Sequence, residues 1–265
     1  MILQTTAQVS TPSRNLWRIY ALEAKYEFLK QMRLPAYVVP SLAFPLVFYF
    51  MFGVALPHGH GTFDVPTYML ATYGAFGVMN VSLFGFGVGV ALERGQGWML
   101  FKRASPMPPF AYFTAKLSTI LLFSLVMASS LFLLGATAGG VRLAPGSWLS
   151  LLGTLALGTI PFAAFGLAVA CWAGPNSAVA VLNIVALPSA FGSGMWIPIQ
   201  MLPPVIRKIA LFLPPYHYAQ LALRTLGLDH GEAPSLHLAI LAAFTLLSLA
   251  LAWTGYRRDE GKTFG

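Results

Sequence analysis

The stretch VVPSLAFPLVFYFMFGVAL, residues 38–56, contains no charged side chain and consists almost entirely of apolar residues. A helix of about 20 such residues is long enough to cross the hydrocarbon core of a bilayer. Uncharged windows of this kind recur along the chain, and a Gly-Pro-Asn turn signal at 174–176 divides the longest of them. We therefore predict six transmembrane helices, of which the other five are 65–92, 117–141, 148–172, 177–197 and 233–256.

The composition supports an all-α integral membrane protein. The mean hydropathy is +0.71, and only 9% of the residues are charged, against roughly 25% in soluble domains. The net charge of +8 comes from Lys and Arg that flank the apolar windows rather than forming one basic stripe. The expected partner is therefore membrane lipid and not nucleic acid. Cys171 is the single cysteine, so no intrachain disulfide can form.

Basic residues are distributed unequally between the two sides that six spans define. The N-terminal region, the segment 93–116 and the C-terminus together hold 12 Lys and Arg residues, and the connections on the opposite side hold 4. Cytoplasmic loops carry the excess of Lys and Arg. We therefore expect both termini and the segment 93–116 in the cytoplasm.

Three regions follow from this layout. Residues 1–34 are expected to form an amphipathic cytoplasmic helix in the membrane interface, or a helix packed on a partner; its apolar face would hold Trp17, Tyr20, Ala21, Ala24, Phe28 and Met32. Residues 35–256 form the six-span domain, and 257–265 a cytoplasmic tail. Before the sixth span, the proline-rich segment 198–224 is predicted to form a short re-entrant helical element at the outer surface.

Residues that would support catalysis or metal binding do not form a convincing set. No Asp, Glu, Lys or Arg falls within the six predicted spans, which disfavours an ion-coupled carrier without eliminating it. Ser193 lies between small residues with no committed histidine partner, and His58 and His60 are a weak ligand set. The Gly-Lys-Thr at 261–263 lacks the first glycine of a phosphate-binding loop. We predict no catalytic residue, no metal site and no cofactor in this chain.

The segment 93–116 concentrates charges, glycines and prolines in an otherwise apolar chain. Gly95 and Gly97 would interrupt the second span, and Pro106 would end a short amphipathic helix that begins near Trp98. Its apolar side chains would be exposed to water unless a partner or lipid buries them. The segment is therefore interpreted as a docking element, with a helix lying on lipid as the alternative.

Two separated motifs resemble those of the membrane subunits of type-2 ATP-binding-cassette (ABC) exporters, and the likeness covers nearly the whole chain. The first motif consists of Glu93-Arg94, Gly97, Ser105-Pro106, Tyr112 and Lys116. The second consists of Ser193-Gly194, Pro198, Leu202-Pro203, Pro215, Tyr218 and Leu223-Arg224. Gly95, Trp98 and Pro214 depart from residues that are common in relatives, where an acidic residue, Thr and Asn respectively are frequent.

The resemblance implies a permease subunit in a bacterial inner membrane. It implies that this subunit pairs with two separate ATPase subunits, which bind ATP and Mg. It also implies a second permease copy, so that the two permeases form a homodimer rather than a heterodimer. It assigns coupling to the ATPase to Glu93, Arg94, Gly97, Trp98, Lys102, Arg103, Ser105 and Pro106. It assigns the translocation path to Phe76, Asn80, Phe84, Asn183 and Leu187, and the outer re-entrant motif to Ser193, Gly194, Pro198, Leu202, Pro203, Pro215, Tyr218 and Arg224.

The uncharged spans favour an apolar or amphipathic cargo, drug-like or lipid-linked, that moves outward. An exporter of polysaccharides or lipid-linked glycans is the alternative within the same class. A stand-alone ion-coupled carrier and an intramembrane enzyme are the alternatives from other classes.

Overall fold

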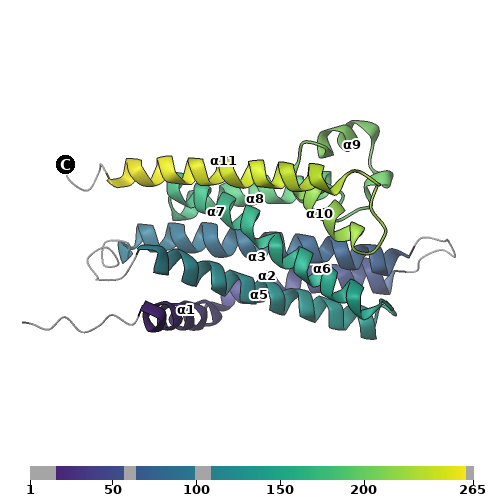
Figure 1. Cartoon of the computed structure of the whole chain (residues 1–265), viewed down its shortest axis with the longest axis horizontal. Helices are drawn as coiled ribbons and strands as arrows, with labels where there is room; N and C mark the ends of the chain where they lie inside the picture. The colour runs from purple at the N-terminus through teal and green to yellow at the C-terminus, as the bar shows by residue number, and fades with distance from the viewer. Residues whose placement is uncertain (1–15, 57–63, 99–108, 261–265) are drawn as a thin grey trace, which may run out of the picture.

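The computed structural model describes residues 16–56, 64–98 and 109–260, and the described residues form helices joined by short connections (Figure 1). The helices are α1 (Leu16–Met32), α2 (Pro35–Phe48) with a π-helical continuation (Tyr49–Ala55), α3 (Val65–Gly95), α5 (Pro109–Thr137), α6 (Pro145–Leu157), α7 (Thr159–Trp172), α8 (Pro175–Gly192), α9 (Pro204–Ala210), α10 (Pro214–Arg224) and α11 (Pro234–Glu260), with a 3-10 turn at Ile199–Met201. The all-α prediction is confirmed.

Six of the described helical segments are long and apolar enough to cross a membrane. They are Tyr37–Ala55, Val65–Gly95, Ala111–Thr137, Pro145–Trp172, Pro175–Gly192 and Pro234–Arg258. The second of them, α3, lies at the centre of the bundle and packs against α2, α5, α7, α8 and α10. Of its apolar window 72% is buried, against 17% for the first span and 28% for α8. The first span and α8 therefore turn most of their surface outward.

Prolines determine where many helices begin and where one span breaks. Proline occupies the first turn of α2, α3, α6, α8, α9 and α10, where its missing N–H costs no helical hydrogen bond. Inside a helix, proline cannot bond to the carbonyl four residues earlier. Pro161 therefore explains why α6 ends at Leu157 and α7 restarts at Thr159 within one span. Tyr218 fits against Gly158 at this break, and its hydroxyl donates to the Leu155 carbonyl over 2.8 Å.

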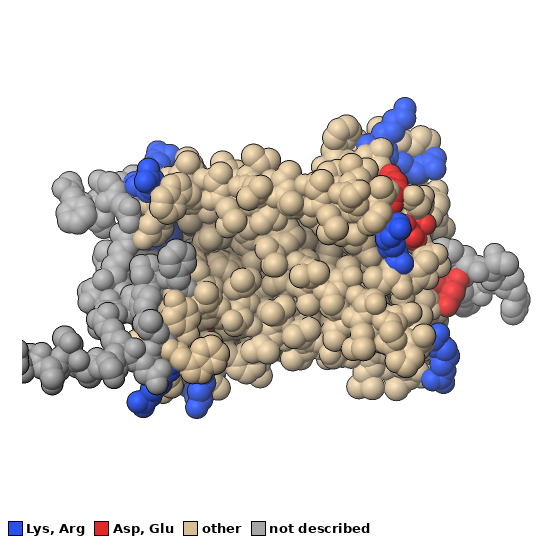
Figure 2. Space-filling view, in the orientation of Figure 1, with Lys and Arg blue, Asp and Glu red and all other residues tan. Residues whose placement is uncertain are grey.

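The charged residues mark the two ends of the bundle. The middle of the visible face is free of Lys, Arg, Asp and Glu, and the charged side chains gather at both ends (Figure 2). The C-terminus and α1 lie at one end, and α9 and α10 at the other (Figure 1). This distribution fits a bilayer around the middle of the bundle.

The helix ends differ from the predicted spans at the end where α1 lies. α3 continues beyond residue 92 and includes Glu93 and Arg94, and α5 begins at Pro109 and includes Lys116. Glu93 is 5% exposed and Lys116 is 2% exposed. The two helices therefore extend past the predicted span limits at 92 and 117, because the folded chain pairs these charges with one another, as described below. α3 ends at Gly95, one of the glycines expected to interrupt it.

The N-terminal helix α1 packs on the bundle through a face that differs in part from the predicted one. Glu27 and Gln31 are its buried side chains, each 5% exposed, whereas Trp17 is 82% exposed and Met32 50%. The predicted apolar face overlaps only partly with the packed face. The packed face contacts α5. The carboxylate of Glu27 can be buried there because it pairs with Lys116 of α5.

Candidate coupling site and transport cavity

Four of the eight predicted coupling residues fall within the described residues, and four do not. Glu93 and Arg94 occupy the last turn of α3, and Gly97 and Trp98 follow it. Gly97 has a φ of +77°, which L side chains rarely adopt, so this glycine allows the chain to turn away from the helix. Lys102, Arg103, Ser105 and Pro106 lie outside the described residues.

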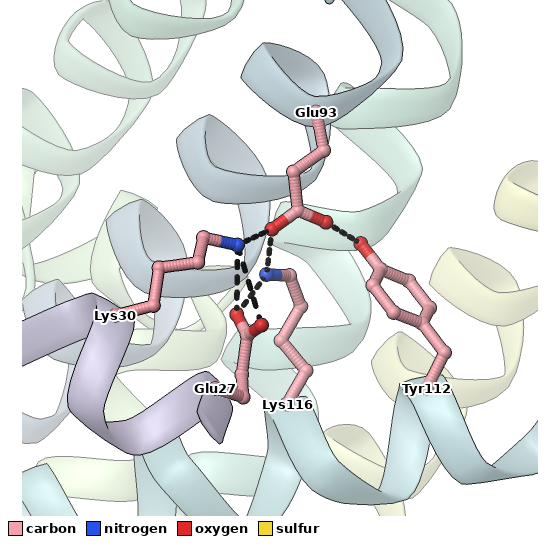
Figure 3. A network of polar contacts seen from close by, with 5 residues as sticks. All are labelled: Glu27, Lys30, Glu93, Tyr112 and Lys116. Atoms are coloured by element: carbon pink, nitrogen blue, oxygen red, sulfur yellow. Dashed lines mark hydrogen bonds and ion pairs between the residues drawn. The ribbon is translucent and has the colours of Figure 1, made fainter. Parts of the chain in front are cut away.

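Glu93 is the centre of a buried polar network that joins three helices (Figure 3). Its Oε1 accepts from Lys116 Nζ of α5 over 2.9 Å and also from Lys30 Nζ of α1. Its Oε2 accepts a hydrogen bond of 2.5 Å from the Tyr112 hydroxyl of α5. Lys116 Nζ additionally donates to Glu27 Oε1 of α1 over 2.5 Å. We call Glu27, Lys30, Glu93, Tyr112 and Lys116 the three-helix network.

The charges of this network balance, since two carboxylates face two ammonium groups. The Lys30 side chain remains 45% exposed, and its Nζ lies 3.2 Å from Glu27 Oε2. Burial lowers the pKa of Lys30, but the carboxylates of Glu93 and Glu27 raise it more, so the net shift is above the ordinary value. Lys30 therefore stays charged at neutral pH. Tyr112 and Lys116 are buried, and both side chains point into the network.

Removing a buried charge without its partner is costly, because the remaining charge stays unpaired away from water. The network therefore holds the end of α3, the start of α5 and α1 in one arrangement. Arg94 adds a fourth helix, since its Nη1 donates to the carbonyl of Ala170 near the end of α7. Trp98, just beyond α3, is 55% exposed. The arrangement can transmit a force applied at the end of α3 to several helices together.

A cavity of about 390 Å³ opens between α2, α3 and α8. Its lining residues are Tyr37, Pro40, Ser41, Phe44, Pro45, Phe76, Asn80, Phe84, Asn183 and Leu187. All five residues predicted for the path, Phe76, Asn80, Phe84, Asn183 and Leu187, are among them. The lining contains aromatic and aliphatic side chains, four polar side chains and no charged residue.

The two asparagines use their amide N–H groups within their own helices. Asn80 Nδ2 donates to the Phe76 carbonyl, and Asn183 Nδ2 to the Val179 carbonyl, each over 2.9 Å. The Tyr37 hydroxyl likewise donates to the Val81 carbonyl over 2.9 Å. These bonds leave the carboxamide oxygens as hydrogen-bond acceptors at the cavity.

Comparison with known proteins bears directly on this geometry. The sequence model described as "ABC-2 type transporter" matches residues 20–226, a range that includes every described residue of the three-helix network and of the cavity. The chain belongs to the ABC-2 type transporter family. It is also 27% identical over 241 residues to "Putative transport permease YvfS" of Bacillus subtilis (strain 168), an alignment that covers 88% of this chain and 95% of that protein. This chain is accordingly a permease of the ABC transporter class.

In this ABC-2 permease the residues of the predicted re-entrant motif lie at the end of α8, in α10 and in the connections around α9. Ser193 and Gly194 end α8, and Gly194, at a φ of +82°, allows Ile199 to pack closely. Leu202 joins Ile199, Ala210 and Tyr216 in a small separate core. The remaining motif residues frame α9 and α10: Pro198, Pro203, Pro215, Tyr218, and Arg224, whose Nη1 lies 3.0 Å from Asp229 Oδ2. The described contacts of these residues are those of packing and of helix ends.

Sequence reasoning missed two members of the three-helix network. Glu27 and Lys30 were assigned to a surface helix, although both contribute to the buried cluster around Glu93. The available signal was weak: Glu27 is one of only 8 acidic residues in this ABC-2 permease, and Lys30 follows it at i+3. Such a pair on a helix surface also occurs without any further partner.

Proposed function

We propose that this chain is the membrane subunit of an ABC exporter, and that it moves an apolar or amphipathic molecule outward with energy from ATP hydrolysis on a separate subunit. The three-helix network is the observation that carries the proposal. It places a buried, balanced set of charges at the end of α3 and in the first turns of α5. A segment that only lies on the lipid surface would not require a buried set of paired charges.

The coupling step would use the network as a rigid joint. An ATPase subunit would contact the segment 93–106 at the cytoplasmic side. Because Glu93 binds Lys116 of α5 and Lys30 of α1, movement of this segment would displace α1, α3 and α5 together. The Glu93 carboxylate is directed inward, so it would act as a positioning residue, while exposed groups such as Trp98 would supply direct contact.

The cavity between α2, α3 and α8 would receive the cargo. Its aromatic and aliphatic lining favours an apolar body, and the absence of charge among its lining residues disfavours an ionised one. The acceptor oxygens of Asn80 and Asn183 would favour a cargo that carries hydroxyl or N–H donors.

Two copies of this chain and two ATPase subunits would form the transporter, with both chain termini in the cytoplasm. The first span and α8 border the cavity and have the largely exposed apolar surfaces that a second copy could cover, with Phe44, Val181 and Leu187 among the exposed side chains. A path between the copies would then include both cavities. We favour a homodimer over a heterodimer.

Purification of the chain from native membranes in mild detergent tests this proposal. We expect a stoichiometric partner with a complete phosphate-binding loop, and we expect this partner to be lost when residues 93–106 are scrambled. The matched control replaces Arg207 and Lys208, two basic residues of α9 at the opposite end, with Ala and should retain the partner.

A second variant separates docking from transmission. Glu93→Gln should retain the partner and its ATPase activity but lose coupled transport, because the network loses its central charge. Absence of any ATPase partner in functional membranes, together with uptake or efflux driven by an ion gradient alone, would instead identify a stand-alone carrier.

A further inference from the structure

Two buried histidines face each other at the end of the bundle opposite α1. His217 of α10 is 2% exposed and His237 in the first turns of α11 is 1% exposed. Their Nδ1 atoms lie 2.8 Å apart. Neither the three-helix network nor the cavity includes them, so the pair requires its own explanation.

The hydrogen-bond partners determine where the protons of this pair lie. Two facing nitrogens at this distance share one proton, so one of them donates and the other accepts. His217 Nε2 lies 3.0 Å from the Leu211 carbonyl oxygen, which can only accept, so this nitrogen carries a proton. The Nδ1 of a neutral His217 is then bare and accepts from His237 Nδ1–H.

This assignment leaves one position at which a further proton can bind. Neutral His237 with its proton on Nδ1 has a bare Nε2, and that nitrogen lies 3.6 Å from Glu232 Oε2. A lone pair that faces a carboxylate gives no attraction. A proton on Nε2 would convert the same contact into a charge-assisted hydrogen bond, which is shorter and stronger than a neutral one.

The surrounding groups act on this proton in both directions. Burial opposes a charge on His237, as do the neighbouring His217 and Arg224, which is itself paired with Asp229; the carboxylates of Glu232 and Asp229 favour it. The Tyr216 hydroxyl donates to the same Glu232 oxygen over 3.1 Å and holds the carboxylate in place. Among the helices packed on α10, α3 contributes Tyr68, an uncharged phenol near Tyr216.

We propose that His217 and His237 form a single-proton site whose occupation closes an ion pair between His237 and Glu232 and tightens the packing of α10 on α11. The donors do not converge on one point, since His237 uses Nδ1 toward His217 and Nε2 toward Glu232. This arrangement suits a proton and not a metal ion. Among the described residues no group of three or more His, Cys, Asp and Glu side chains is arranged to hold a metal.

The site would make the outer part of the protein respond to acid. Histidine is the side chain whose ordinary pKa lies closest to neutrality, so it changes charge in mildly acidic surroundings. α10 also contacts the break in the fourth span through Tyr218, so a change at the histidines can reach the bundle. That this end faces the outside rests on the function proposed above; the proton site itself does not.

Hydrogen exchange of the full chain in lipid nanodiscs tests the site without any transport assay. Amide exchange of peptides that cover residues 211–240 is measured at pH 5.5 and 7.5 and corrected for the intrinsic effect of pH. We expect about tenfold slower corrected exchange at pH 5.5, the size of effect that one added charge-assisted hydrogen bond between His237 and Glu232 produces. His237→Gln and Glu232→Gln should each abolish this difference.

His230→Gln is the matched control, because His230 lies on the same connection and is exposed; its ring lies 3.4 Å from Gln200, and its backbone N–H, which the substitution keeps, donates to Gln220 Oε1. It should keep the full pH effect. Corrected exchange that is independent of pH in the unmodified chain, or a pH effect that persists in Glu232→Gln, would overturn the proposal. So would protection that appears only with added zinc and disappears with a chelator. Failure of the ATPase pull-down leaves these results unaffected.

Discussion

At the scale of single residues, Lys116 best illustrates how charge is accommodated in an apolar chain. Its side chain is among the largest fully buried ones, and its ammonium group contacts the carboxylates of both Glu27 and Glu93. A buried ammonium without partners would shift its pKa and lose its charge. Two carboxylates from different helices supply the partners, so Lys116 is stable only where all three helices meet.

We predict that Lys116→Met destabilises the protein by about 3–5 kcal/mol, because two buried carboxylates would lose their main partner. Lys30→Ala should cost only about 1 kcal/mol or less, because the Lys30 side chain is 45% exposed and water replaces part of its contact. The free energy of unfolding in mixed detergent micelles, followed by circular dichroism, measures both. Equal losses in the two variants would contradict the asymmetry in burial.

At the scale of helices, α3 and α7 approach each other closely through their backbones. A Cβ added at Gly166 would meet the Leu83 carbonyl oxygen at 2.8 Å and the Gly87 nitrogen at 3.0 Å, so the two backbones touch there. The Gly85-x-x-x-Gly89 pair of α3 has the spacing of a helix contact motif but does not form this contact. Gly85 faces the side chains of Tyr37 and Ile120, and Gly89 has only ordinary contact with Lys116. Close helix packing in membranes depends on such small residues.

Gly166→Ala should therefore separate α3 from α7 and destabilise the protein by about 1–3 kcal/mol, as overpacking typically does. Gly153→Ala is the control on the same span, because nothing lies within 4 Å of its added Cβ. That variant should be neutral or stabilised by up to about 1 kcal/mol from helix propensity. Thermal unfolding in one detergent compares the two, and a Gly166→Ala protein as stable as the parent would refute the backbone contact.

At the scale of the whole molecule, the two ends of the bundle have different contents. The end with α1 and the C-terminus contains the three-helix network, and the other end contains α9, α10 and the histidine pair (Figures 1 and 2). The balance of Lys and Arg favours the first end as cytoplasmic. The cavity lies between the two ends, against the middle of α3.

Single-cysteine labelling tests this orientation. In a Cys171→Ala background, Gln200→Cys should react with a membrane-impermeant maleimide in intact cells, because residue 200 is exposed near α9. Gln96→Cys, exposed just after α3, should react only after the membrane is permeabilised. The opposite pattern would invert the assignment of inside and outside.

Much of the fold was predictable because desolvating a charge is costly. Uncharged windows located all six spans, and proline and glycine signals located many helix ends. The predicted span limits were wrong where other interactions compensate the cost of desolvating a charge. Glu93 and Lys116 looked like the limits of spans, yet both lie inside helices, because ion pairs between helices compensate their burial.

Part of the cavity lining was predicted from the sequence and part was not. The five path residues were assigned from family resemblance, and the structure gathers them around one cavity. Tyr37 and Ser41 of α2 complete the lining but carried no sequence signal, because a tyrosine or serine near the end of an apolar span is ordinary.

The sequence alone determined that the chain crosses a membrane six times and which loops carry the basic charge, since both follow from local composition. Only the tertiary structure decided that Glu27 reaches Glu93 through Lys116, that Gly166 meets Gly87, and that the Nδ1 atoms of two histidines lie 2.8 Å apart. These contacts join residues far apart along the chain. Their stability depends on complementary partners in space, which no single segment of sequence contains.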